Sequence, residues 1–238
     1  MNKQSNLYTL VYIIVLVVLV GTALAFTSIS LKDRQQANAD ADKMRQILAS
    51  VNVYPEAANI IADYNTYITD SYVVDETGAR VADAPKAFDV NVAAESKLDA
   101  GKRLLPVYVC TLAGGEQKYI LPLYGAGLWG PIWGYISVDA DGSTIYGAYF
   151  AHQGETPGLG AEIEKPAFSS QFIGKELIKG DSFLPVAVVK SGQKPSGDED
   201  YVDAISGATI TSKGVGAMAD NCLAPYAAFL EAAAKSNK

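Results

Sequence analysis

Residues 203–209 read DAISGAT and combine hydroxyl side chains with small residues just before a helical pattern. The last of them, Thr209, follows a glycine and an alanine, which leave room for a ligand to approach its hydroxyl. The first amides of a helix lack partners within the helix, so they can hold an anion such as a phosphate. The same segment also fits a turn followed by a helix cap from Thr211 or Ser212.

A second segment, 152–160, reads HQGETPGLG and follows a predicted strand that ends at Phe150. Its glycines around a Thr-Pro pair predict a loop whose backbone amides can approach a flat ligand closely. An ordinary surface loop has a similar composition, because glycine and proline mark turns in general. Taken alone, the segment fits both interpretations.

Three aromatic side chains near these segments could take part in chemistry. His152 is the only histidine, and a lone histidine beside a strand end is more often structural than catalytic. Trp129 and Trp133 fit stacking on a ligand or partner and core packing equally well. We find no hydrolase motif, no P-loop and no dinucleotide-binding fingerprint, so neither hydrolysis nor NADH binding is expected on this chain.

Two strand pairs are expected to position the loops. The first joins 104–112 to 118–123 through a turn at Gly114-Gly115, and the second joins 134–138 to 143–150 through a DADG turn. A short hairpin over 72–81, a strand over 184–189 and a short helix over 168–172 are also expected. The order of helices, strands and helix predicts an α+β domain with a largely antiparallel sheet flanked by helices.

Two helical patterns flank these strands. The first is expected to face the core through apolar residues at three- and four-residue spacing, which are Ile60, Ile61, Tyr64 and Ile68. The second is an alanine-rich helix over 213–234 that Pro225 should bend or interrupt.

The N-terminal part predicts one membrane span. No charged residue occurs between Gln4 and Leu31, and residues 10–20 read LVYIIVLVVLV, which suffices for the hydrocarbon layer. We therefore expect a transmembrane anchor over 1–31, a helical stalk over 32–55 and a soluble domain over 56–238. The alternative is a cleaved signal peptide, since 23–25 reads ALA.

The basic residues around the span point to one orientation. More of them follow the span than precede it, a count that places the domain in the cytoplasm. A long domain can be translocated regardless of such charges, so the count does not decide the orientation.

Charge and cysteine content exclude other classes. The net charge is −7, which argues against nucleic acid or anionic lipid as a partner of the domain. Cys110 and Cys222 lie in no CxxC or Cys/His pattern, so no metal site is expected. Both are expected to be buried thiols, with a disulfide between them as the alternative in an oxidising compartment.

In combination and in this order, GETPGLG at 154–160 and DAISGATITS at 203–212 resemble the FMN-binding domain of respiratory flavoproteins. With the span and the stretch LYGAGLWGPIWG at 123–134, nearly the whole chain is similar to the NqrC family of the bacterial Na+-translocating NADH:quinone oxidoreductase. The RnfG family of the Rnf electron-transfer complex shares the span, the loop and the SGAT sequence but lacks the insert at 127–134. The insert therefore favours the first family.

The resemblance implies that Thr209 is the acceptor onto which a flavin transferase esterifies FMN through its phosphate, with Thr211 as a neighbouring decoy. Asp203 matches the acidic residue that opens the recognition pattern of the transferase. The other residues implied around the cofactor are Ser206, Gly207 and Ala208 beside the acceptor, and Glu155, Thr156, Pro157, Leu159 and Gly160 against the isoalloxazine ring. Hydrogen bonds to the phosphate are expected from Thr211, Ser212 and Lys213.

By the same resemblance, the chain is expected to be a covalent-FMN electron carrier that is not catalytic alone. Its expected partners are the other subunits of the reductase, the flavin transferase during maturation, and lipid around the anchor. The family places the domain in the periplasm on the inner membrane, against the charge count. The alternatives are an electron carrier like RnfG and a membrane-anchored binding or assembly module without a cofactor.

Overall fold

The computed structural model describes residues 6–180 and 182–236, and the chain divides into two units, 1–43 and 44–238. The described part of the first unit is the exposed length of helix α1 (Asn6–Ala49). By length and composition this helix can cross a bilayer. It contains residues 6–31 of the predicted anchor, whereas residues 1–5 lie outside the described part of the chain.

The second unit is built on a five-stranded antiparallel sheet whose strands lie in sequence order. These strands are β1 (Ile68–Val74), β2 (Leu105–Thr111), β3 (Gln117–Ala126), β4 (Pro131–Asp139) and β5 (Ile145–His152). The turn between β2 and β3 places Gly114 and Gly115 at positive φ, and the turn between β4 and β5 does the same with Gly142. Both predicted strand pairs and the α+β class are confirmed.

Helices and short strands surround the sheet. Between β1 and β2 lie η1 (Ala87–Asp89), α3 (Val92–Glu95) and η2 (Ala100–Lys102), while α2 (Ile60–Tyr67) precedes β1. After β5 come η3 (Gly160–Glu164), α4 (Pro166–Ser169), η4 (Ser170–Phe172), β6 (Ile178–Lys179), β7 (Ser182–Phe183), β8 (Ala187–Val189) and β9 (Tyr201–Asp203). The chain continues with α5 (Thr209–Leu223), η5 (Ala224–Tyr226) and α6 (Ala227–Ser236).

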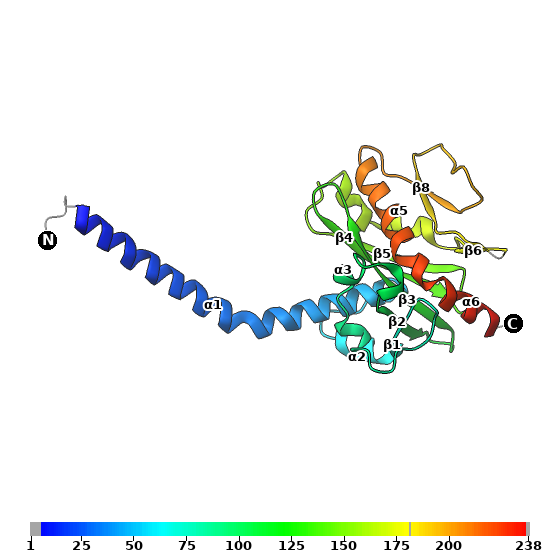
Figure 1. The fold of residues 1–238 in the computed structure, drawn as a ribbon, viewed down its shortest axis with the longest axis horizontal. Coiled ribbons are helices and arrows are strands. Elements are labelled where there is room, and N and C mark those ends of the chain that lie inside the picture. The colour runs from blue at the N-terminus through cyan, green and yellow to red at the C-terminus, as the bar shows by residue number, and fades with distance from the viewer. Residues whose placement is uncertain (1–5, 181, 237–238) are drawn as a thin grey trace. The chain divides into compact units, whose positions relative to one another are not determined.

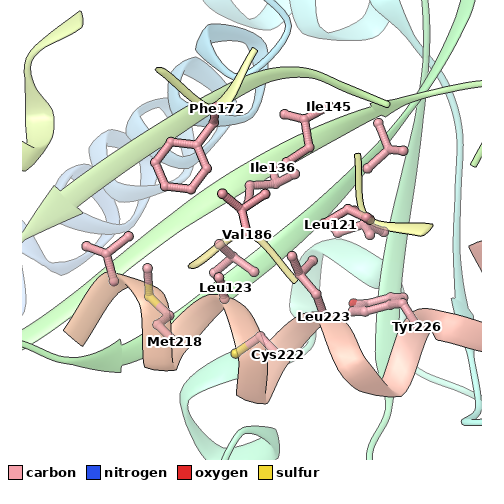
Figure 2. Packing of buried hydrophobic residues seen from close by; sticks show 14 of the residues in the cluster. Leu121, Leu123, Ile136, Ile145, Phe172, Val186, Met218, Cys222, Leu223 and Tyr226 are labelled. Carbon is pink, nitrogen blue, oxygen red and sulfur yellow. The ribbon is translucent and has the colours of Figure 1, made fainter. Parts of the chain in front are cut away.

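One face of the sheet packs against the C-terminal helices, which cross it in Figure 1. Leu121, Leu123 and Ile136 point from the strands toward α5, where Met218 and Leu223 meet them (Figure 2). The predicted interruption at Pro225 is confirmed, because α5 ends before it and a 3-10 turn leads into α6.

The other face packs against the end of α1. Ile47, Leu48 and Val51 are buried there with Tyr64 of α2. Ser137 of β4 donates its hydroxyl hydrogen bond to the carbonyl of Ser50, at 2.6 Å. The compact unit therefore begins at Met44, inside the segment predicted as a stalk, and the division of the chain at 31 and 55 stays a prediction.

The predicted first helix was partly wrong. Ile60 and Tyr64 are buried as expected, but the side chain of Ile61 is 61% exposed and Ile68 begins β1. The helix ends at Tyr67. The helical spacing of apolar residues extends to Ile68 only because the strand that follows also has a buried face.

The predicted short hairpin over 72–81 is present as one antiparallel bridge between Val74 and Arg80, on the side of β1 that β2 does not occupy. The Val81 amide donates to the Val73 carbonyl, and the Asp75 amide donates to the Ala79 carbonyl.

Two other expectations need correction. The strand over 184–189 is shortened to β8, which pairs in parallel with β9. The last helix begins at Thr209 rather than Lys213, so Thr211 and Ser212 lie inside its first turn and do not cap it.

Both cysteines are buried free thiols, as predicted. Cys110 belongs to the core beside α1, whereas Cys222 belongs to the core beneath α5. Because the sheet separates these cores, a disulfide between the two residues is excluded by geometry. Burial raises the pKa of the Cys110 thiol to about 11 and also raises that of Cys222.

Leu48 tests the contribution of the end of α1 to the fold, because its side chain is 0% exposed. Leu48→Ala is expected to lower the free energy of unfolding by about 2–5 kcal/mol, since it leaves a cavity in a closed core. Urea unfolding of the detergent-solubilised full chain, followed by tryptophan emission, measures the change. The control Leu98→Ala removes a side chain that is 42% exposed and should stay within about 0.5 kcal/mol of wild type. Equal effects from both variants would contradict the placement of α1.

Candidate functional site

A cleft of about 260 Å³ lies where the two glycine-containing segments meet. Its lining includes most of the residues predicted around the site, which are Glu155, Thr156, Leu159, Gly160, Gly207, Ala208, Thr209 and Thr211. Segments that are distant in sequence are therefore brought to one place. Leu159 and Gly207 are in contact across it, since a Cβ on Gly207 would stand 2.9 Å from the Leu159 Cδ2 atom.

Five predicted residues lie outside the lining of the cleft, namely Pro157, Asp203, Ser206, Ser212 and Lys213. Asp203 ends β9, where its amide donates to the Gln171 side chain at 2.9 Å. Lys213 lines a separate groove with Glu199 and Asp220. The Ser212 side chain is buried, and its hydroxyl donates to the carbonyl of Ala208 at 2.9 Å. Its expected role as a phosphate donor is therefore not supported by the geometry.

The carboxylate of Glu155 joins three stretches of chain. One oxygen accepts the backbone amide of Trp129 at 2.8 Å, and the other accepts the hydroxyl of Thr211 at 2.6 Å. Trp129 belongs to the turn between β3 and β4, whereas Thr211 lies in the first turn of α5. We call this pair of contacts the Glu155 clasp. The side chain is only 4% exposed, so the clasp forms in the interior.

The electrostatics of the clasp favour an ionised carboxylate. Burial opposes ionisation, but hydrogen bonds from the Thr211 hydroxyl and the amides of Trp129 and Leu128 outweigh it and lower the pKa of Glu155. The negative charge is thus held at the base of the cleft at neutral pH.

Two glycines make room for the clasp. A Cβ on Gly127 would stand 2.5 Å from one Glu155 oxygen, and a Cβ on Gly160 would collide with the other oxygen and with Thr211. Any larger residue at either position would displace the carboxylate. These glycines therefore allow the Glu155 carboxylate to pack closely against the backbone. We had expected a different role for Gly160, namely to let a ligand approach the backbone.

Thr209 and Thr211 differ in their accessibility although both lie in the first turn of α5. Thr211 is 1% exposed, and its hydroxyl is committed to the clasp. Thr209 is exposed in the cleft, and its hydroxyl has no hydrogen-bond partner among residues 6–180 and 182–236. The first hydrogen bond of the helix runs from the Ser212 amide to the Ala208 carbonyl, so the amides of 209–211 precede the helical ladder.

The aromatic residues take different positions. Trp129 lies on the rim of the cleft and is 70% exposed. Trp133 instead anchors the end of α1, because its Nε1 donates to the Gln46 side chain at 2.9 Å. His152 contacts the loop that follows it, since its Nδ1 accepts the Glu155 amide at 3.1 Å, and its expected structural role stays a prediction.

Leu128 and Ile210 line the cleft but were missed from the sequence. They are 48% and 60% exposed, so the rim is apolar around the hydroxyl of Thr209. Leu128 lies in a turn and Ile210 lies at a helix start, and at both places an apolar side chain has no core to face. That combination is the signal in the sequence that could have identified them. Ile210 stands between the two candidate threonines, outside the helix predicted over 213–234.

Residues 125–130 read GAGLWG and fit the spacing GxGxxG, contrary to the expectation that the sequence contains no such motif. In the structure it joins the antiparallel strands β3 and β4. A dinucleotide fingerprint requires a strand that leads into a helix within a βαβ unit. The expectation that NADH does not bind through such a motif is therefore unchanged.

Comparison with known proteins gives one family throughout. A family described as the FMN-binding domain matches residues 127–224. The NqrC protein of the Na(+)-translocating NADH-quinone reductase of Vibrio alginolyticus is 33% identical over 228 residues, covering 90% of this chain and 89% of that protein. The corresponding protein of Yersinia pestis is 33% identical over 232 residues, covering 90% and 87%.

Two crystal structures are similar to the chain. The NqrC protein of the Na(+)-translocating NADH-quinone reductase from Parabacteroides distasonis is 49% identical with a TM-score of 0.78, covering 84% of this chain and 96% of that one. NqrC of Shewanella oneidensis is 23% identical with a TM-score of 0.66, covering 83% and 98%, and shows a shared fold.

The Glu155 clasp predicts a pH dependence. A carboxyl whose pKa is lowered on folding stabilises the fold above its unfolded pKa of about 4.3, and this contribution disappears as the pH falls through the folded pKa. Glu155→Gln should therefore lose less stability than wild type between about pH 5 and pH 3. At pH 7 it should be less stable by about 1–3 kcal/mol, because a charged acceptor is lost.

Urea unfolding of the full chain at a series of pH values measures this difference. Glu162→Gln removes a carboxylate of η3 that does not line the cleft, and it should keep the acid dependence of wild type. An identical acid dependence in Glu155→Gln and wild type would contradict the ionised clasp.

Proposed function

Because this chain belongs to the NqrC family of the Na(+)-translocating NADH-quinone reductases, we propose that it is the flavin-bearing electron carrier of such a complex. Its FMN-binding domain would hold FMN, and the flavin would be reduced by one redox partner in the complex and oxidised by another. Since the sequence offers no fingerprint for NADH, the chain would not be catalytic alone.

The accessibility of Thr209 carries the proposal that FMN is attached covalently. Esterification requires a hydroxyl that a transferase can reach, and Thr209 is exposed in the cleft. Thr211 is disfavoured as an acceptor because its hydroxyl is buried against Glu155. The fold therefore supports one acceptor of the two threonines that the sequence places next to each other.

The cleft fits the two chemically different ends of FMN. The phosphodiester would face the first amides of α5, which have no helical partners and favour an anion. Lys213 lines a separate groove beside Glu199 and Asp220, so these amides rather than its ammonium would face the phosphate. The apolar rim of Leu128, Trp129 and Ile210 suits a flat aromatic ring.

The roles of the chain's own residues follow from this fit. FMN supplies the electron-transfer chemistry when it is attached. A covalently attached flavin would not dissociate in any redox state. The residues around the ring could therefore bind one redox state more strongly than another without loss of the cofactor. Glycines at 127 and 160 and the Glu155 clasp would hold the walls of the cleft in place.

The membrane and the partners complete the proposal. We place α1 as a single-pass anchor in the inner membrane, with lipid around its apolar length and the domain on the periplasmic side. The partners would be the other subunits of the reductase and, during maturation, a flavin transferase that reads the segment from Asp203 to Thr209. The span contains no acidic or basic side chain between 6 and 31, so a sodium path would lie in other subunits.

Thr209→Ala is expected to abolish covalent flavin, because the exposed acceptor is gone. The full chain is co-expressed with a flavin transferase, and each variant is analysed by intact mass and by in-gel flavin fluorescence. Wild type should carry one added FMN mass and Thr209→Ala none.

Thr211→Val is the matched control, since it removes the neighbouring hydroxyl and keeps the acceptor. It should retain the FMN mass. A Thr209→Ala protein that still carries FMN would assign the acceptor elsewhere. A colourless wild-type protein from its native host would favour the alternative of an assembly module without a cofactor.

The orientation is tested by a reporter fused to the C-terminus of the full chain. We expect activity of a periplasmic reporter such as alkaline phosphatase, and none from a reporter that requires the cytoplasm. The reverse result would agree with the count of basic residues after the span and overturn the proposed orientation.

A further inference from the structure

The charge of Glu155 is a property of the cleft that flavin attachment does not require. Of the described residues that line the cleft, Glu155 is the only one with an ionisable carboxylate or a basic side chain. It lies at the base of the cleft and is 4% exposed, whereas Trp129 on the rim is 70% exposed. A ring that fills the cleft would therefore lie against a fixed negative charge.

Hydrogen bonds stabilise this charge without removing it. The Thr211 hydroxyl and the Trp129 amide are neutral dipoles, and they leave one net negative charge on the carboxylate. The field of a net charge extends further than that of a dipole. Because the surroundings are poorly hydrated, salt and water screen this field less than they would at the surface.

Within the part of the chain that the structure describes, no basic side chain forms an ion pair with the Glu155 carboxylate. Lys213 lines the separate groove beside Glu199 and Asp220. His152 presents its Nδ1 to the Glu155 amide as an acceptor, and its Nε2 lies 3.6 Å from the carboxylate of Glu164. The positive end of α5 also opens on the cleft, but the phosphodiester on Thr209 would face those amides.

We propose that Glu155 lowers the midpoint potential of the flavin in this cleft by holding a permanent negative charge against it. The inference rests on the proposed function in one respect, namely that FMN occupies the cleft. Reduction adds electrons to the ring, and a nearby negative charge makes that addition less favourable. The reduced flavin is then a stronger donor to the group that it reduces.

Glu155→Gln tests the proposal, since it keeps the size of the side chain and an acceptor for the Trp129 amide but removes the charge. The full-length chain carrying FMN is titrated spectroelectrochemically in detergent at pH 7. The midpoint potential of Glu155→Gln should be more positive than that of wild type. The matched control Glu162→Gln removes a carboxylate outside the cleft, and its potential should change less.

A second variant separates charge from geometry. Thr211→Val breaks the same clasp but leaves the carboxylate, which then has one donor fewer to compensate it. Its flavin should have a potential equal to or more negative than that of wild type. If the shift in Glu155→Gln came only from a distorted cleft, Thr211→Val would shift the potential in the same positive direction, and this result would overturn the proposal.

Two further outcomes are distinguishable. A Glu155→Gln potential that equals that of Glu162→Gln refutes the role of Glu155 and leaves the proposed function intact. The absence of an FMN mass on wild type refutes covalent attachment, and the same titrations are then made on the chains with added FMN. Should Glu155→Gln fail to fold, a positive shift in Thr211→Val still overturns the proposal, and a potential equal to or more negative than that of wild type supports it.

Discussion

A carboxylate that is taken out of water needs other donors, and this requirement at Glu155 organises the cleft. An unpaired buried charge is far more unfavourable than a paired one. The donors that satisfy it come from the turn after β3 and from the first turn of α5. Because a single side chain must reach both, the positions of these segments are fixed relative to the loop that follows β5. Without glycine at 127 and 160, the carboxylate would not fit between them.

The antiparallel sheet makes this meeting of segments possible. β3 ends, β4 begins and β5 ends at the same edge, as the pairing of Ala126 with Pro131 and of Ile132 with His152 shows. Loops at one edge of a rigid sheet are held close together without long connections, which is where binding residues are commonly found. β4 also links the edge to the opposite face, because Trp133 follows the cleft turn and holds Gln46 of α1.

The sequence predicted the parts of the structure that depend on local rules. Glycine turns at 114–115 and 142, alternating strands and the break at Pro225 were found because each depends on neighbours in the chain. The clasp was not predictable, since Glu155 and Thr211 are distant in sequence and nothing local distinguishes a buried glutamate from an exposed one. The same limit explains Thr211 and Ser212, which local rules assigned to capping and phosphate binding but which tertiary contacts bury. Ile61 and Ile68 show the reverse case, in which a regular apolar spacing crossed the boundary between a helix and a strand.

The order of the elements along the chain determines when the cleft can form. Each strand of the sheet pairs with the next one in sequence, so the sheet can assemble while later residues are still being synthesised. The first turn of α5, which supplies both Thr209 and the hydroxyl that holds Glu155, comes almost at the C-terminal end. A nascent chain that stops before α5 would have the sheet but not the cleft. The proposed attachment of flavin would therefore follow the synthesis of α5, because the acceptor hydroxyl and the cleft exist together only once that helix has docked.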